Sequence, residues 1–159
     1  MTYDDQDYRR RNSLRLQGFD YSARRVYFVT IVVAERRNIF SDQRIAKATI
    51  DCLFELRRKL GFKLYRYCLM PDHFHALIGT GESKKPLGVI CGSFKSISTR
   101  AYWKWYEGKL WQRQFFDHVV RNEQDFFETI LYIKQNPVRK GLVNTPEEWP
   151  YTGVVDELQ

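Results

Sequence analysis

Two histidines lie close together in a strongly apolar segment of the chain. The segment LMPDHFHALI, residues 69–78, holds His73 and His75, two of the three histidines among 159 residues. Side chains alternate along a β-strand, so in a strand this pair points to one face while Phe74 and Ala76 point to the other. Two imidazoles that converge in this way can hold a metal ion. Two partly exposed histidines beside a hairpin turn would show the same spacing, which by itself does not separate these alternatives.

A tyrosine and an asparagine lie four residues apart in the segment ETILYIKQNPVRKGLV. This spacing places Tyr132 and Asn136 on the same side of a helix. A helical wheel sets them roughly opposite a core stripe formed by Phe126, Ile130 and Ile133. Core packing is the ordinary role of a helical tyrosine, but the wheel predicts that Tyr132 lies off the core stripe of its own helix.

Together these side chains predict a phosphoryl-transfer site. His73 and His75 would supply two metal ligands and Asn136 an amide oxygen, with water and substrate phosphate oxygens at the remaining positions. The metal would polarise the phosphate. The phenol of Tyr132, whose ordinary pKa is near 10, would act as the covalent nucleophile and form a phosphotyrosine link.

The first half of the chain predicts the elements that carry the histidines. Residues 25–34, RVYFVTIVVA, are typical of a central strand covered on both faces. Ser41 is a candidate N-cap for a helix that Gly61 ends. FKLYRYCLM and HFHALIGT then predict two strands joined at Pro71 and Asp72, as in an antiparallel hairpin.

The second half predicts a helix over residues 86–106, a strand over residues 110–120 and a third helix that Asn122 and Asp125 open and that stops near Pro137. The order β, α, β, β, α, β indicates an α+β fold of the ferredoxin-like type. We therefore expect an antiparallel βαββαβ sheet with two helices on one face and the other face open, plus a C-terminal helix that bears the tyrosine. His118 either orients substrate or caps the fourth strand, and the structural role is favoured.

Length and composition favour one domain over residues 1–159, with 43% apolar residues and no apolar run long enough to span a bilayer. The N-terminus lacks the apolar core of a secretory signal peptide. Cys52, Cys68 and Cys91 match no zinc-site spacing and leave one thiol over in any disulfide scheme, so we expect reduced core thiols in a cytoplasmic protein.

The chain is basic, with 26 Lys and Arg residues against 19 acidic ones and a sequence pI of about 9.4. This balance favours a polyanionic partner. The candidates for phosphate contacts are Arg9, Arg10 and Arg11 in a basic N-terminal arm (residues 1–13), and Lys95, Arg100, Arg113 and Arg139. A solvated basic surface is the alternative for all of them. Trp111 and Phe115 are candidates for stacking on unpaired bases.

These motifs resemble those of a known family. His73, Phe74 and His75 match the His-hydrophobic-His motif of HUH single-strand endonucleases, and Tyr132 with Asn136 matches the tyrosine helix of single-tyrosine transposases. The segments MPDHFHALI, LWQRQFFDHVVRNEQDF and YIKQNPVRKGLV are similar to those of the REP-associated tyrosine transposases, of the insertion-sequence 200 type. The resemblance extends over residues 14–151.

The resemblance implies binding and cleavage of single-stranded DNA beside a palindromic hairpin, with Mg²⁺ or Mn²⁺. Tyr132 would be joined to the 5′ phosphate, leaving a 3′ hydroxyl that can reverse the reaction. His73 and His75 would be metal ligands, and Asn136 the third ligand, where many relatives have glutamine. A monomer is favoured, and a homodimer, as in related insertion-sequence transposases, is the alternative.

Two other functions fit parts of the sequence. A noncatalytic protein that binds hairpin nucleic acid could use the same sheet, although the aromatic signature of RNA-recognition modules is absent. A hydrolase of small phosphate esters would need more protein ligands for its metal than two imidazoles and an amide.

Overall fold

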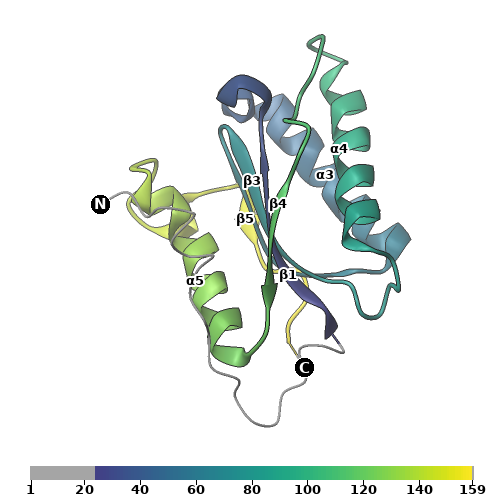
Figure 1. Cartoon of the computed structure of the whole chain (residues 1–159). Helices are drawn as coiled ribbons and strands as arrows, with labels where there is room; N and C mark the ends of the chain where they lie inside the picture. The colour runs from purple at the N-terminus through teal and green to yellow at the C-terminus, as the bar shows by residue number, and fades with distance from the viewer. Residues whose placement is uncertain (1–23, 159) are drawn as a thin grey trace.

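The computed structural model describes residues 24–158, which form a five-stranded antiparallel sheet and three α-helices (Figure 1). The strands are β1 (Val26–Val32), β2 (Lys63–Met70), β3 (His73–Gly79), β4 (Phe116–Val120) and β5 (Thr152–Gly153). The helices are α3 (Gln43–Leu60), α4 (Leu87–Tyr102) and α5 (Glu123–Arg139), with short 3-10 turns η1 (Ala34–Arg36), η2 (Ile39–Ser41) and η3 (Pro146–Glu148). The strand order is β4-β1-β3-β2-β5. The predicted ferredoxin-like order is therefore confirmed, with β5 as an addition that the sequence pattern did not reveal.

Several element ends differ from the prediction. Ser41 lies in η2, and the side chain of Asp42 instead accepts a hydrogen bond from the backbone N–H of Arg44 as the N-cap of α3. Gly61 ends this helix as expected, with a left-handed φ of 75°. The fourth strand is shorter than the predicted 110–120. Trp111 forms only an isolated bridge with Val33.

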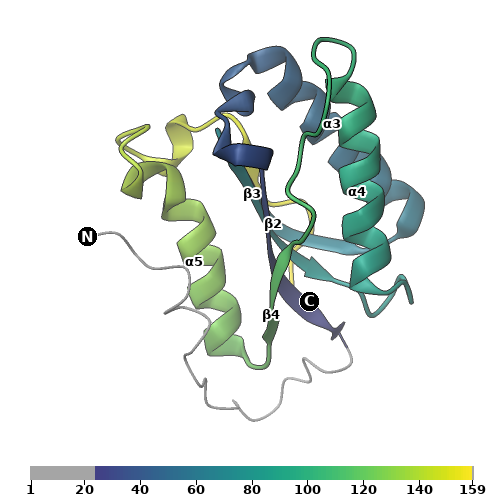
Figure 2. The ribbon, with the colours of Figure 1, turned by 45° about the horizontal axis from the view of Figure 1, so that its top comes forward.

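Each face of the sheet is covered by helices. In Figures 1 and 2, α3 and α4 lie on one side of the sheet and α5 on the other. The prediction of an open second face is therefore wrong. Phe126 and Ile133 of α5 join an apolar cluster with Phe28 of β1 and Leu77 of β3, and burial of these side chains holds the helix on the sheet.

The three cysteines form no disulfide. Cys68 and Cys91 are buried thiols, as predicted, and burial raises the pKa of each to about 12. Cys52 is only half-buried. Within residues 24–158, no helix has the length and apolar character needed to cross a membrane.

Candidate active site

The two histidines lie on the face of β3 that α5 covers. The ring centroids of His73 and His75 are 4.6 Å apart. Phe74 points to the opposite face, where its ring packs on Phe94 of α4. The shared face of the histidines is thus as expected, and the alternative of two partly exposed histidines is wrong. The side chains are buried, with 7% of His73 and 1% of His75 exposed, because α5 lies over them.

The Nδ1 atom of each imidazole has a hydrogen-bond partner. His73 Nδ1 lies 2.7 Å from Asp72 Oδ1, and His75 Nδ1 lies 3.0 Å from Thr30 Oγ1. This contact with His73 holds the pKa of Asp72 below its usual range. An ionised carboxylate only accepts hydrogen bonds, so His73 Nδ1 carries a hydrogen, and in the neutral ring Nε2 presents a lone pair. Such contacts orient histidine ligands in metal sites.

Helix α5 brings an amide to this lone pair. Asn136 Nδ2 lies 3.3 Å from His73 Nε2, although 63 residues separate the two along the chain. Asn136 is 1% exposed. From the last turn of α5, Asn136 therefore completes a set of two imidazoles and one amide.

Tyr132 lies one turn earlier on α5. Its ring centroid is 5.8 Å from that of His75 and 5.7 Å from that of Phe28. The guanidinium of Arg139 lies 4.2 Å from the centre of the Tyr132 ring and donates a hydrogen bond of 2.6 Å to the Tyr132 carbonyl. The tyrosine, the histidines and the amide therefore share one buried site.

The prediction that Tyr132 lies off the core stripe of its own helix is wrong. Tyr132 is 8% exposed and belongs to the same apolar cluster as Phe126 and Ile133. The buried side of α5 also includes Asp125, Thr129 and Asn136. Its inward surface is therefore wider than the apolar stripe alone and contains polar groups.

The donor set is compatible with an open cation site. Within residues 24–158 there is no group of three or more His, Cys, Asp or Glu side chains that could hold a metal. Two imidazoles and an amide oxygen would leave positions for water and phosphate oxygens, as in catalytic rather than structural sites.

His118 pairs with a residue that the sequence did not indicate. His118 Nε2 lies 2.7 Å from Asp125 Oδ2. This contact joins β4 to the first turn of α5. The neighbour Asp117 is not its partner in this contact. His118 therefore links the tyrosine-bearing helix to the sheet edge.

The predicted phosphate-binding residues separate into distinct regions. Arg139 contacts Tyr132, as described above, whereas Arg9, Arg10 and Arg11 lie outside the described residues. A groove along α4, which we call the α4 groove, has a volume of about 780 Å³. Its lining includes four cations, Lys95, Arg100, Lys109 and Arg113, and two tryptophans, Trp103 and Trp111.

The two tryptophans of the α4 groove have different environments. Trp111 is 2% exposed and donates a hydrogen bond of 2.8 Å to Ser98, so the prediction that it stacks on bases is wrong. The Trp111 ring packs against the rings of Phe40 and Phe94 in the core. Trp103, which the sequence did not indicate as a candidate for stacking, is 56% exposed. The predicted helix over residues 86–106 included Trp103, and the earlier end of α4 at Tyr102 is a feature of the structure.

Comparison with known proteins identifies relatives of this chain. A family model described as IS200-like transposase matches residues 22–136. The chain is 26% identical over 144 residues to a Haemophilus influenzae protein assigned as a REP-associated tyrosine transposase, covering 84% of this chain and 81% of that protein. It is 25% identical over 100 residues to the REP-associated tyrosine transposase of Escherichia coli, covering 63% of this chain and 59% of the relative.

A solved structure has the same fold. It is a REP-associated tyrosine transposase bound to a REP hairpin, and it superposes with a TM-score of 0.73 at 21% identity, covering 89% of this chain and 82% of the other. The family match spans the paired histidines, the tyrosine and the asparagine. The chain therefore belongs to the IS200-like transposase family.

Proposed function

We propose that the protein is a metal-dependent endonuclease and strand transferase that cuts single-stranded DNA beside a hairpin through a 5′-phosphotyrosine intermediate. One observation carries this proposal: His73 and His75 of β3 meet Tyr132 and Asn136 of α5 in one site. The relatives support it, since two are REP-associated tyrosine transposases by name and one solved relative is bound to a REP hairpin.

The residues that would hold the cation are His73, His75 and Asn136. The contacts at Nδ1 leave Nε2 of each imidazole as the ligand atom. Asn136 would turn its amide to present Oδ1 in place of the present contact between Nδ2 and His73. When bound, Mg²⁺ or Mn²⁺ polarises the scissile phosphate, and the imidazole nitrogens suit Mn²⁺ better than Mg²⁺.

Tyr132 supplies the nucleophile. Its phenolic oxygen forms a bond to phosphorus, the bond from phosphorus to the 3′ oxygen breaks, and the phenolic proton is lost. The leaving oxygen takes up a proton and becomes a 3′ hydroxyl, which can attack the phosphotyrosine to reverse the step. The guanidinium of Arg139 over the ring stabilises the negative charge that develops on the phenolic oxygen.

One chain supplies every group of this site, because Asn136 contacts His73 of the same chain. This arrangement supports a monomer as the active form. A homodimer that exchanges α5 is the alternative. Light scattering at the protein concentration used for cleavage distinguishes the two, and a dimeric mass would contradict the monomer.

The deciding experiment uses hairpin-bearing single strands from DNA next to the gene, with Mn²⁺ and denaturing electrophoresis. The wild type should yield a cut strand and a covalent protein–DNA adduct. Tyr132→Phe removes only the phenolic oxygen, so it should bind the hairpin normally but lose cleavage and adduct, by roughly 10⁶-fold if this nucleophile resembles others.

Tyr106→Phe is the matched control, because Tyr106 is exposed and its hydroxyl donates a hydrogen bond to Asp42, which is not part of the site. This variant should cut like the wild type. Full activity of Tyr132→Phe would exclude Tyr132 as the nucleophile. Hairpin binding by the wild type with neither cleavage nor adduct would favour the noncatalytic binding protein.

A further inference from the structure

The α4 groove concentrates positive charge along its lining. None of the residues that line it is acidic. No salt bridge within residues 24–158 involves the four groove cations, which are Lys95, Arg100, Lys109 and Arg113. Burial lowers the pKa of Lys95, and repulsion from Lys109 lowers it further. A bound anion would relieve this repulsion, and the row of cations suits a chain of phosphates.

An exposed aromatic ring flanks these cations. Trp103 is 56% exposed, and its indole N–H donates a hydrogen bond of 2.7 Å to the carbonyl of Gly108. This bond fixes one edge of the ring. Lys95 donates a hydrogen bond of 2.7 Å to the carbonyl of Arg113, which holds the other wall of the groove. Cations that follow a backbone beside an aromatic ring are the usual means of binding single-stranded nucleic acid.

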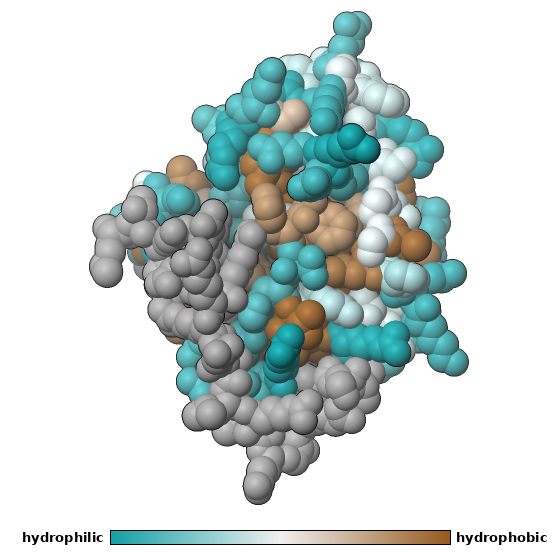
Figure 3. Space-filling model, viewed as in Figure 1, coloured by the Kyte–Doolittle hydropathy of each residue, from teal (hydrophilic) through white to brown (hydrophobic). Residues whose placement is uncertain are grey.

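One end of the α4 groove lies near the histidine strand, although His73 and His75 face the opposite side of the sheet. The backbone N–H of Gln112, in the groove lining, donates a hydrogen bond of 2.8 Å to the carbonyl of Val32. Val32 in turn is paired with His73 across β1 and β3. Two strand spacings, about 10 Å, therefore separate this end of the groove from the histidine strand. In Figure 3, hydrophilic side chains gather over the upper end of α4 and the loop that follows it.

We infer that the α4 groove binds the unpaired DNA that flanks the hairpin, with phosphates on Arg100, Lys109 and their neighbours and one base stacked on Trp103. This inference rests on the proposed function, since it assigns the α4 groove to the same DNA strand that enters the tyrosine site. The groove, of about 780 Å³, has room for a few unpaired nucleotides.

The test compares two oligonucleotides, a hairpin with a single-stranded extension and the same hairpin without it, by fluorescence anisotropy. The wild type should bind the extended hairpin more tightly. Trp103→Ala should weaken that binding by about 5- to 100-fold, the usual effect of losing one stacked base, and leave the blunt hairpin unaffected. Trp103→Phe keeps a stacking face and should restore most of the affinity.

A double variant tests the phosphate contacts. Arg100→Ala with Lys109→Ala should lower the dependence of log affinity on log salt by about 1.4 for the extended hairpin, from about 0.7 per lost contact. Lys47→Ala with Arg58→Ala removes the same charge from the exposed surface of α3 and is the matched control. For the extended hairpin, the dependence of log affinity on log salt should stay clearly steeper in this control than in the groove variant.

The outcomes separate this inference from the proposed function. Equal losses on both oligonucleotides would overturn the inference and assign the groove to the stem, and unchanged binding by the groove variants would overturn it outright. Neither result touches the role of Tyr132, which the adduct experiment tests by itself. Failure of the wild type to bind either oligonucleotide would instead contradict the proposed function.

Discussion

The two faces of the sheet are built differently. Between the sheet and the helices α3 and α4 lies a large cluster of buried apolar side chains, to which Phe74 and Phe94 belong. Beneath α5 the apolar cluster is smaller. Buried polar side chains lie beside it: Thr30, His73, His75, Asp125, Thr129 and Asn136.

This difference is consistent with the site that we propose beneath α5. Polar groups in a protein interior lower stability unless hydrogen bonds compensate them, and an apolar side chain of the same volume would often be at least as stable. The face that α3 and α4 cover comes closer to this rule, with Thr49 and Ser98 as the buried polar side chains of these two helices. The α5 face departs from it at the residues that we assign to the reaction.

Variants of the two histidines should reduce cleavage more than any other change on the α5 face described below. His73→Ala and His75→Ala each remove a proposed metal ligand, so cleavage should fall well beyond the roughly 10- to 100-fold that loss of an outer-shell contact costs. Both residues are buried, so each variant also needs a thermal melt to show that it is folded. Normal cleavage by either variant, or by the wild type in excess chelator, would contradict the metal site.

Opposite effects on stability and activity should distinguish the two faces. Phe74→Ala empties a site that is 1% exposed, and the free energy of unfolding should fall by about 3–5 kcal/mol. Asn136→Leu removes the buried amide and leaves His73 Nε2 without this contact, so the free energy of unfolding should fall by only about 1–3 kcal/mol while cleavage is lost. Urea titrations and cleavage assays on both variants measure this contrast. Cleavage by Asn136→Leu at the wild-type rate would remove the amide from the site.

A smaller effect should follow from the carboxylate behind the first histidine. Asp72→Asn keeps the shape of the side chain but removes the charge that orients His73, so the Mn²⁺ concentration needed for half-maximal cleavage should rise about 10- to 100-fold. Asp51→Asn, at an exposed position of α3, is the control and should have no effect. An unchanged Mn²⁺ dependence in Asp72→Asn would mean that this carboxylate does not support the site.

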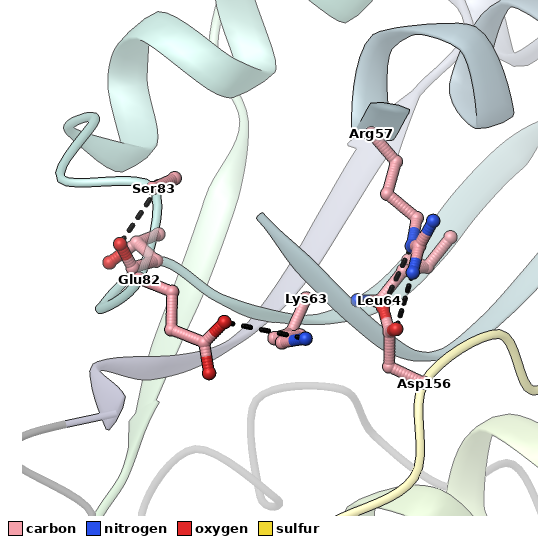
Figure 4. Close-up of polar contacts among 7 residues, drawn as sticks. Arg57, Lys63, Leu64, Glu82, Ser83 and Asp156 are labelled. Atoms are coloured by element: carbon pink, nitrogen blue, oxygen red, sulfur yellow. Dashed lines mark hydrogen bonds and ion pairs between the residues drawn. The ribbon is translucent and has the colours of Figure 1, made fainter. Parts of the chain in front are cut away.

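The smallest effect concerns a contact at the end of β2 remote from the site. Asp156 accepts hydrogen bonds from two nitrogens of Arg57 and, at 2.8 Å, from the backbone N–H of Leu64 (Figure 4). Asp156→Asn should lower the free energy of unfolding by about 1–2 kcal/mol, because Arg57 is partly exposed, and should leave cleavage unchanged.

The pH dependence of that loss follows from the direction of the shift. Arg57 holds the pKa of Asp156 below its ordinary value of 3.8. The stabilisation is therefore complete above pH 3.8 and disappears as the pH falls through the folded-state pKa. Below the folded-state pKa of Asp156, urea titrations of the wild type and Asp156→Asn should give the same free energy of unfolding. A constant difference at all pH values would assign the loss to packing instead of charge.

The sequence by itself determined the order of the elements and the common face of His73 and His75. Alternation along a strand and a four-residue spacing on a helix are local geometry, so they hold wherever the element lies. The two-residue strand β5 is too short to show any such pattern.

Only the tertiary structure decided how these elements meet. Burial of apolar side chains on both faces places α5 over the histidines. The same burial places Trp111 in the core, whereas Trp103 is exposed. The contact between His73 and Asn136 joins residues 63 positions apart. No local periodicity specifies such a distance, because it results from the packing of the whole chain around its two apolar clusters.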